Sequence, residues 1–123
     1  MDLMNTGAAT LTIRLSLRGA TSSINAPGYV TTTGFSLPGD GLWHQAAFSL
    51  AAADLTPING PAAPATFLTS VAESRVFHSP GANTTVGVNF NGSFSVDNIR
   101  ALPEPGSAAL LVLAGAGALR RRR

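Results

Sequence analysis

Two histidines and a few separated carboxylates are the side chains of this chain best suited to metal binding. They are His44, His78, Asp54, Glu73 and Asp97. Zinc ligands usually lie three to five residues apart on one helix or turn, and among these five residues only Glu73 and His78 have that spacing. We therefore expect packed or solvated histidines and no metal site from the spacing alone.

Catalytic chemistry has little support in the same residues. A glycosidase needs two converging carboxylates, whereas the acidic residues of the first hundred positions stand singly in the sequence. The G-x-S-x-G pattern of a serine nucleophile is absent, and there is no cysteine. We expect a non-catalytic protein with no catalytic residue and no cofactor.

Trp43 is the one candidate for binding a sugar. Period-two alternation over residues 42–50 places Trp43 with Gln45 on the more polar side of a strand. An aromatic ring on a polar face can stack on a sugar ring. The alternative is a tryptophan packed under a loop at the start of its strand.

The composition favours a turn-rich β protein. Charged residues make up 11% of the chain, against roughly a quarter in soluble domains, and there are 13 glycines and 8 prolines. All eight basic residues are arginines, and half of them are the last four residues. Residues 1–119 hold four arginines against six acidic residues, so no basic surface for nucleic acid is expected.

Short apolar and β-branched segments separated by turn residues predict the strands. We expect strands at residues 10–18, 29–37, 42–50, 74–79, 84–90 and 93–101, and a helical turn within 66–73. The Pro-Gly-Asp-Gly stretch at 38–41 predicts a hairpin. A second hairpin with a loop at 91–93 would place Phe90 opposite Phe94 and Val88 opposite Val96.

The strand at 10–18 shows the clearest alternation. Its apolar residues are Leu11, Ile13, Leu15 and Leu17, and its polar residues are Thr12, Arg14, Ser16 and Arg18. This pattern predicts a half-buried strand whose polar face is wet.

These elements together indicate an all-β protein, an antiparallel β-sandwich in the form of a partial jelly roll, over residues 1–102. The first twenty residues contain Asp2 and alternate in polarity, unlike a secretory leader. We expect the domain to be the C-terminal part of a larger export precursor. An unpaired sheet edge and an exposed apolar face near the N-terminus would follow.

Residues 103–123 differ from everything before them. Pro103, Glu104 and Pro105 form an extended peptide, because each proline fixes φ and disfavours helix in its predecessor. Residues 106–119 carry no charge and would form a helix about 21 Å long, short against a bilayer core of about 30 Å. Arg120, Arg121, Arg122 and Arg123 follow. Their stems can snorkel to the headgroups, and cations after an apolar run halt translocation.

This order of Pro-Glu-Pro, apolar helix and terminal arginines resembles the PEP-CTERM sorting signal of exported bacterial proteins. The resemblance implies recognition of Pro103, Glu104 and Pro105 by an exosortase, a membrane-embedded transpeptidase. It also implies a transient transmembrane anchor at 106–119 in the lipid bilayer and a cytoplasmic membrane stop at the four arginines.

The body shows a fainter likeness to laminin-G and carbohydrate-binding jelly-roll domains. It rests on the stretches "GLWHQAAFSLAAADLTP", "SRVFHSPG" and "VDNIRA". In such domains an acidic residue of the last strand can help to hold calcium, which prefers oxygen ligands. Asp97 is the matching candidate, and a strand-end hydrogen bond to the backbone is the alternative.

The sequence thus leads us to expect an exported surface or extracellular-matrix protein, held in the inner membrane in transit and then placed at the cell surface. A carbohydrate-binding module that contacts polysaccharide is one alternative. A C-terminal fragment of a secreted hydrolase is the other.

Overall fold

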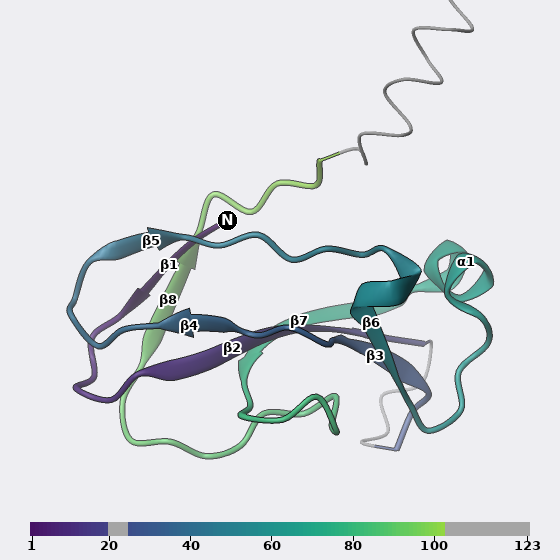
Figure 1. The fold of residues 1–123 in the computed structure, drawn as a ribbon, viewed down its shortest axis with the longest axis horizontal. Coiled ribbons are helices and arrows are strands. Elements are labelled where there is room, and N and C mark those ends of the chain that lie inside the picture. Colours follow the sequence, from purple (N-terminus) through teal and green to yellow (C-terminus); the bar gives the residue numbers. More distant parts are fainter. Residues whose placement is uncertain (20–24, 103–123) are drawn as a thin grey trace, which may run out of the picture.

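The computed structural model describes residues 1–19 and 25–102, which form two antiparallel sheets. The small sheet has the order β5-β1-β8, and the large sheet has the order β4-β2-β3-β6 with β7 also paired to β2. Their strands are β1 (Asp2–Asn5), β2 (Leu11–Arg18), β3 (Gly28–Thr31), β4 (Phe35–Leu37), β5 (Trp43–Gln45), β6 (Leu55–Ile58), β7 (Glu73–His78) and β8 (Phe94–Asp97). The expected all-β antiparallel sandwich is confirmed (Figure 1).

Strand β2 is the centre of the large sheet. Residues 13–18 pair with β7 along one edge, while β4 and β3 pair in turn with the two ends of the other edge. Its regular alternation of apolar and polar residues suits a long, extended strand. Every other strand of this sheet except β6 depends on β2 for its hydrogen bonds.

The core consists of two clusters, one between the two sheets and one between the large sheet and the helical turn that contributes Phe67. One contains Leu3, Leu11, Ile13, Leu37 and Ala46, and the other contains Leu17, Tyr29, Leu55 and Phe67. Phe67 comes from the helical turn α1 (Pro64–Phe67), which starts with proline at its first position and continues as the 3₁₀ turn Leu68–Ser70. Its ring meets that of Tyr29 edge-on, with the centroids 5.2 Å apart. The expected helical turn is therefore confirmed.

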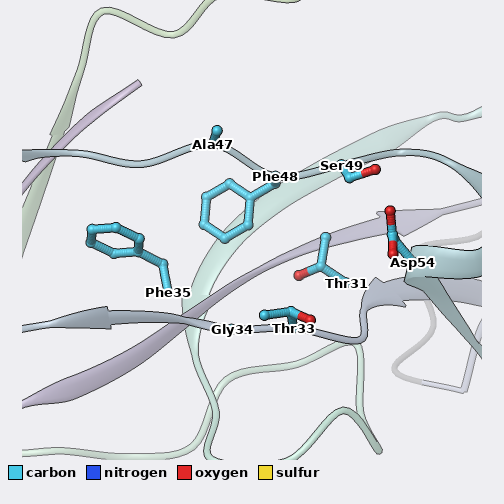
Figure 2. Close-up of a pocket in the computed structure, with 8 residues that line it drawn as sticks. All are labelled: Thr31, Thr33, Gly34, Phe35, Ala47, Phe48, Ser49 and Asp54. Carbon is cyan, nitrogen blue, oxygen red and sulfur yellow. The ribbon is translucent and has the colours of Figure 1, made fainter. Parts of the chain in front are cut away.

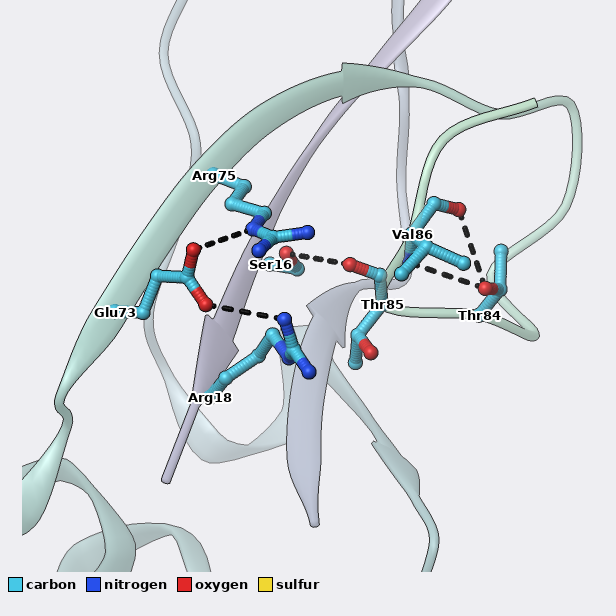
Figure 3. Close-up of polar contacts among 7 residues, drawn as sticks. All are labelled: Ser16, Arg18, Glu73, Arg75, Thr84, Thr85 and Val86. Atoms are coloured by element: carbon cyan, nitrogen blue, oxygen red, sulfur yellow. Dashed lines mark hydrogen bonds and ion pairs between the residues drawn. The ribbon is translucent and has the colours of Figure 1, made fainter. Parts of the chain in front are cut away.

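The polar face of β2 is buried, so the expectation of a wet face was wrong. Ser16 and Arg18 are fully buried and Arg14 is 7% exposed. Residues 79–88, which follow β7 and form the covering loop, lie over this face. There the Ser16 hydroxyl donates to the carbonyl oxygen of Thr85 at 3.2 Å (Figure 3). Alternation predicts which side of a strand a residue occupies, but it cannot tell that a distant loop covers that side.

Arg14 holds the covering loop and the large sheet together. Its Nε donates to Ser79 O at 3.1 Å and its Nη2 to Pro80 O at 3.1 Å, both just after β7. Its Nη1 donates to Thr31 O at 2.8 Å and to Thr32 O at 2.6 Å, where β3 ends. The planar guanidinium thus serves four backbone carbonyls, a geometry that lysine cannot reproduce.

The expected strand at 29–37 is divided at this point into β3 and β4. Gly34 lies in the gap, where an added Cβ would come within 2.5 Å of Thr12 Cγ2 and 3.3 Å of Arg14 Cζ. The gap therefore needs a residue without a side chain beside Arg14.

The expected hairpin at 38–41 was wrong. β4 pairs with β2 and β5 pairs with β1, so residues 38–41 lead from the large sheet to the small sheet. The strand expected at 42–50 is correspondingly short, since only Trp43–Gln45 pairs. A turn signature shows where the chain reverses but not whether the two flanking strands pair with each other.

The second hairpin was also wrong. Residues 84–90 form no strand, and β8 pairs with β1, with Val96 opposite Leu3 and Phe94 opposite Asn5. The rings of Phe90 and Phe94 still lie 6.1 Å apart. Thr85 contributes instead to the cover over β2, and Phe90 packs against the core cluster around Leu3, which local spacing did not indicate.

Replacing Arg14 with methionine should lower the free energy of unfolding by about 3 kcal/mol, because four backbone carbonyls, two of them in buried contacts, lose a charged donor. Urea denaturation followed by far-ultraviolet circular dichroism measures the change. The matched substitution Arg100→Met, at an exposed position, should change it by less than about 0.5 kcal/mol. Equal effects of the two substitutions would contradict this role for Arg14.

Candidate functional site

The outer face of the small sheet carries the exposed tryptophan. Leu3 in the middle of β1 is fully buried in the core, so its neighbours Asp2 and Met4 face away from the large sheet. Directly opposed residues of antiparallel strands share a face. The outer face therefore consists of Asp2, Met4, Trp43, Gln45, Ser95 and Asp97.

Two rows of side chains cross this face. Met4 lies between Trp43 on β5 and Ser95 on β8, and Asp2 lies between Gln45 and Asp97. Trp43 is 51% exposed, so the tryptophan packed beneath a loop, the alternative considered for it, is not found. With neighbouring strands about 4.8 Å apart, the three strands offer an aromatic surface beside amide, hydroxyl and carboxylate groups.

Asp2 and Asp97 are neighbours although they lie at opposite ends of the described chain. Two carboxylates in direct opposition repel each other, and Asn98 contacts both. Its side-chain amide donates to Asp2 Oδ2 at 2.6 Å, and its backbone N–H donates to Asp97 Oδ1 at 2.7 Å. The hydrogen bond considered as the alternative for Asp97 is therefore present.

The other polar candidates lie apart from this face and from one another. His78 Nδ1 lies 3.1 Å from both the backbone N and O of Thr12, and Asp54 ends the 3₁₀ turn Ala52–Asp54, just before β6. Within residues 1–19 and 25–102, no group of three His, Cys, Asp or Glu side chains is placed to hold a metal ion.

Glu73 bridges a buried and an exposed arginine. Its Oε1 accepts from Arg75 Nε at 2.6 Å and its Oε2 from Arg18 Nη1 at 3.1 Å (Figure 3). The hydrogen bond from Arg75, supported by the charge of both arginines, lowers the pKa of Glu73 below its ordinary value. This group ties the end of β2 to the start of β7 and is a structural contact.

A small hollow opens on another part of the surface, between the β3–β4 gap and residues 47–49. It has a volume of about 280 Å³, and Figure 2 shows the rings of Phe35 and Phe48 along it with the Asp54 carboxylate toward one end. Thr31, Thr33, Gly34, Ala47 and Ser49 complete the lining. Aromatic rings with hydroxyls and one carboxylate suit a single small polyhydroxy ligand.

The sorting residues expected from the sequence lie outside the described residues. These are Pro103, Glu104, Pro105, the apolar run 106–119 and Arg120, Arg121, Arg122 and Arg123. In the part of the chain that is described, no helix has the length and apolar character needed to cross a membrane.

Comparison of the chain with protein-family models, with curated proteins and with solved structures found no match.

The contact between Asp40 and His44 should be detectable in the pH titration of the Asp40 carboxyl group. His44 Nε2 lies 3.0 Å from both carboxylate oxygens of Asp40, and this hydrogen bond, together with one from the Leu42 N–H, lowers the pKa of Asp40. The depressed pKa stabilises the fold above about pH 4, and the contribution is lost as the pH falls through the folded-state pKa. In a carboxyl-carbon NMR titration, His44→Ala should raise the Asp40 pKa toward its ordinary value. Gln45→Ala should leave it low, and an unchanged pKa in His44→Ala would contradict the assignment.

Proposed function

We propose that the chain is an exported, non-catalytic β domain that reaches the cell surface or extracellular matrix through its C-terminal sorting signal. The observation that carries the proposal is the order of three elements at residues 103–123: Pro-Glu-Pro, an uncharged run and four arginines. Lipid solvates the uncharged run, while the arginines remain at the cytoplasmic headgroups. An exosortase-type transpeptidase then acts on the peptide that precedes the run.

The residues that directly precede Pro103 support this proposal. β8 ends at Asp97, and the residues between it and Pro103 are exposed. Ile99 and Leu102 are 69% and 82% exposed. A processing enzyme that acts next to a folded domain needs such an exposed stretch, because a buried peptide cannot enter an active site.

The outer face of the small sheet favours a second candidate function, which is saccharide binding. Trp43 offers an aromatic surface for the apolar side of a sugar ring. Gln45, Ser95 and Asp97 lie on the same face and can bond to sugar hydroxyls. Both functions agree with an exported domain that contacts matrix polysaccharide.

The sorting proposal is tested by replacing Pro103, Glu104 and Pro105 together with alanine. The full chain is expressed behind a secretory leader in a bacterium that contains an exosortase. We expect the parent to lose its tail and the variant to remain unprocessed in the membrane fraction, as measured by mass spectrometry of the C-terminus. Ser107→Ala, next to the motif, should be processed like the parent. A reporter fused after Arg123 and found outside the cell would contradict the proposal.

Saccharide binding is tested with a glycan array followed by titration calorimetry. Trp43→Ala should weaken binding at least about tenfold, because the stacking surface is removed. Leu42→Ala is the control, since Leu42 is 63% exposed and lies outside the outer face. A Trp43→Ala protein that retains full affinity for every glycan of the parent would exclude this face, and a loss with Asp54→Ala would assign binding to the hollow.

A further inference from the structure

One side of the sandwich is open. The small sheet covers the part of the large sheet around Leu11 and Ile13, where Leu3 packs. Toward the end of β2, a groove of about 830 Å³ remains above Leu15 and Leu17. The apolar side chains that line it are Met1, Leu15, Leu17, Ala46, Ala47, Phe48, Leu50, Ile99, Ala101 and Leu102.

Residues 45–50 form one wall of this groove without forming a strand there beyond Gln45. Figure 1 shows this segment passing over the large sheet after β5. The segment leaves Leu15 only partly covered, and Leu50 is exposed. The volume of the groove lies within the range of small-molecule pockets, about 300–1,000 Å³, so the groove can take part of one face of an apolar segment.

We propose that residues 106–119 of this chain occupy the groove when the protein is in water. The inference rests on the proposed function in that the occupant is the membrane anchor of the sorting signal. The groove and the bilayer are then two alternative apolar surroundings for one segment.

The position of the groove identifies the occupant. Residues 98–102, the last ones before Pro103, are themselves part of its lining. The three residues of the Pro-Glu-Pro peptide span at most about 10 Å, so the apolar run begins close to the rim. A segment joined so closely has a local concentration near millimolar or above, which favours it over a dilute free partner.

The chemistry of the run also fits the groove. Residues 106–119 carry no charge, have Ser107 as their only polar side chain and include Leu110, Leu111 and Leu113. Such a segment is unfavourable in water, and leucine side chains suit a lining of leucine, phenylalanine and alanine. The arginines that follow stay hydrated outside.

The absence of cysteine from the chain allows a direct test by disulfide cross-linking. The pairs Leu50→Cys with Leu111→Cys, and Ser74→Cys with Leu113→Cys, join the groove to the run. Both groove positions are exposed enough to tolerate the change. The full-length protein is oxidised in detergent-free buffer, and monomeric cross-linked product is followed by non-reducing electrophoresis.

We expect both pairs to cross-link within the monomer at least tenfold faster than the control pair Asn83→Cys with Leu111→Cys. Asn83 is exposed and lies in the loop over the opposite face of β2. Added phospholipid vesicles should slow the two groove pairs, because the run then enters lipid. Equal rates for groove and control pairs would overturn the proposal. Cross-links between chains in place of those within a chain would also overturn it, by assigning the groove to a second copy.

The result separates this inference from the sorting proposal. Absent cross-links with normal processing by the exosortase would remove the docking of the run and leave sorting intact. Fast intramolecular cross-links in a chain that the exosortase does not process would support the docking of the run. The same result would contradict the sorting proposal.

Discussion

The rest of the structure depends on one set of hydrogen bonds, those that the buried Arg14 guanidinium donates to backbone carbonyls around the large sheet. Arg14 donates to carbonyl oxygens at the end of β3 and in the loop after β7, so it joins both edges of β2 to the cover above. Burial of a charge is costly unless its hydrogen-bonding groups are satisfied. The end of β3 and the chain just after β7 supply those partners, and the polar face of the central strand is thereby covered.

The covering loop makes the molecule asymmetric. The outer face of β2 is closed by the covering loop, whereas the outer face of the small sheet carries the exposed Trp43. The small sheet is also short, which leaves the groove beside Leu17. The molecule thus presents two accessible surfaces of different kind: an aromatic and polar face around Trp43, and an apolar groove next to the last described residues.

These two surfaces agree with the proposal that the chain is exported. The groove would shelter an apolar segment before the segment meets a bilayer, because both places remove the same side chains from water. The face around Trp43 would act after export, where polysaccharide is the abundant neighbour. Neither role requires catalysis, and each uses side chains that the core does not need.

The sequence by itself determined the β class, the position of the central strand, the helical turn near Phe67 and the three-part composition of the last residues. Each of these depends on local periodicity or composition. The tertiary structure alone decided that Arg14, Ser16 and Arg18 are buried, that β4 and β5 belong to different sheets, and that Asp2, Trp43 and Asp97 share one face. The physical reason is that strand pairing and the covering loop join residues far apart along the chain, and the energy of those contacts appears only when the whole chain is folded.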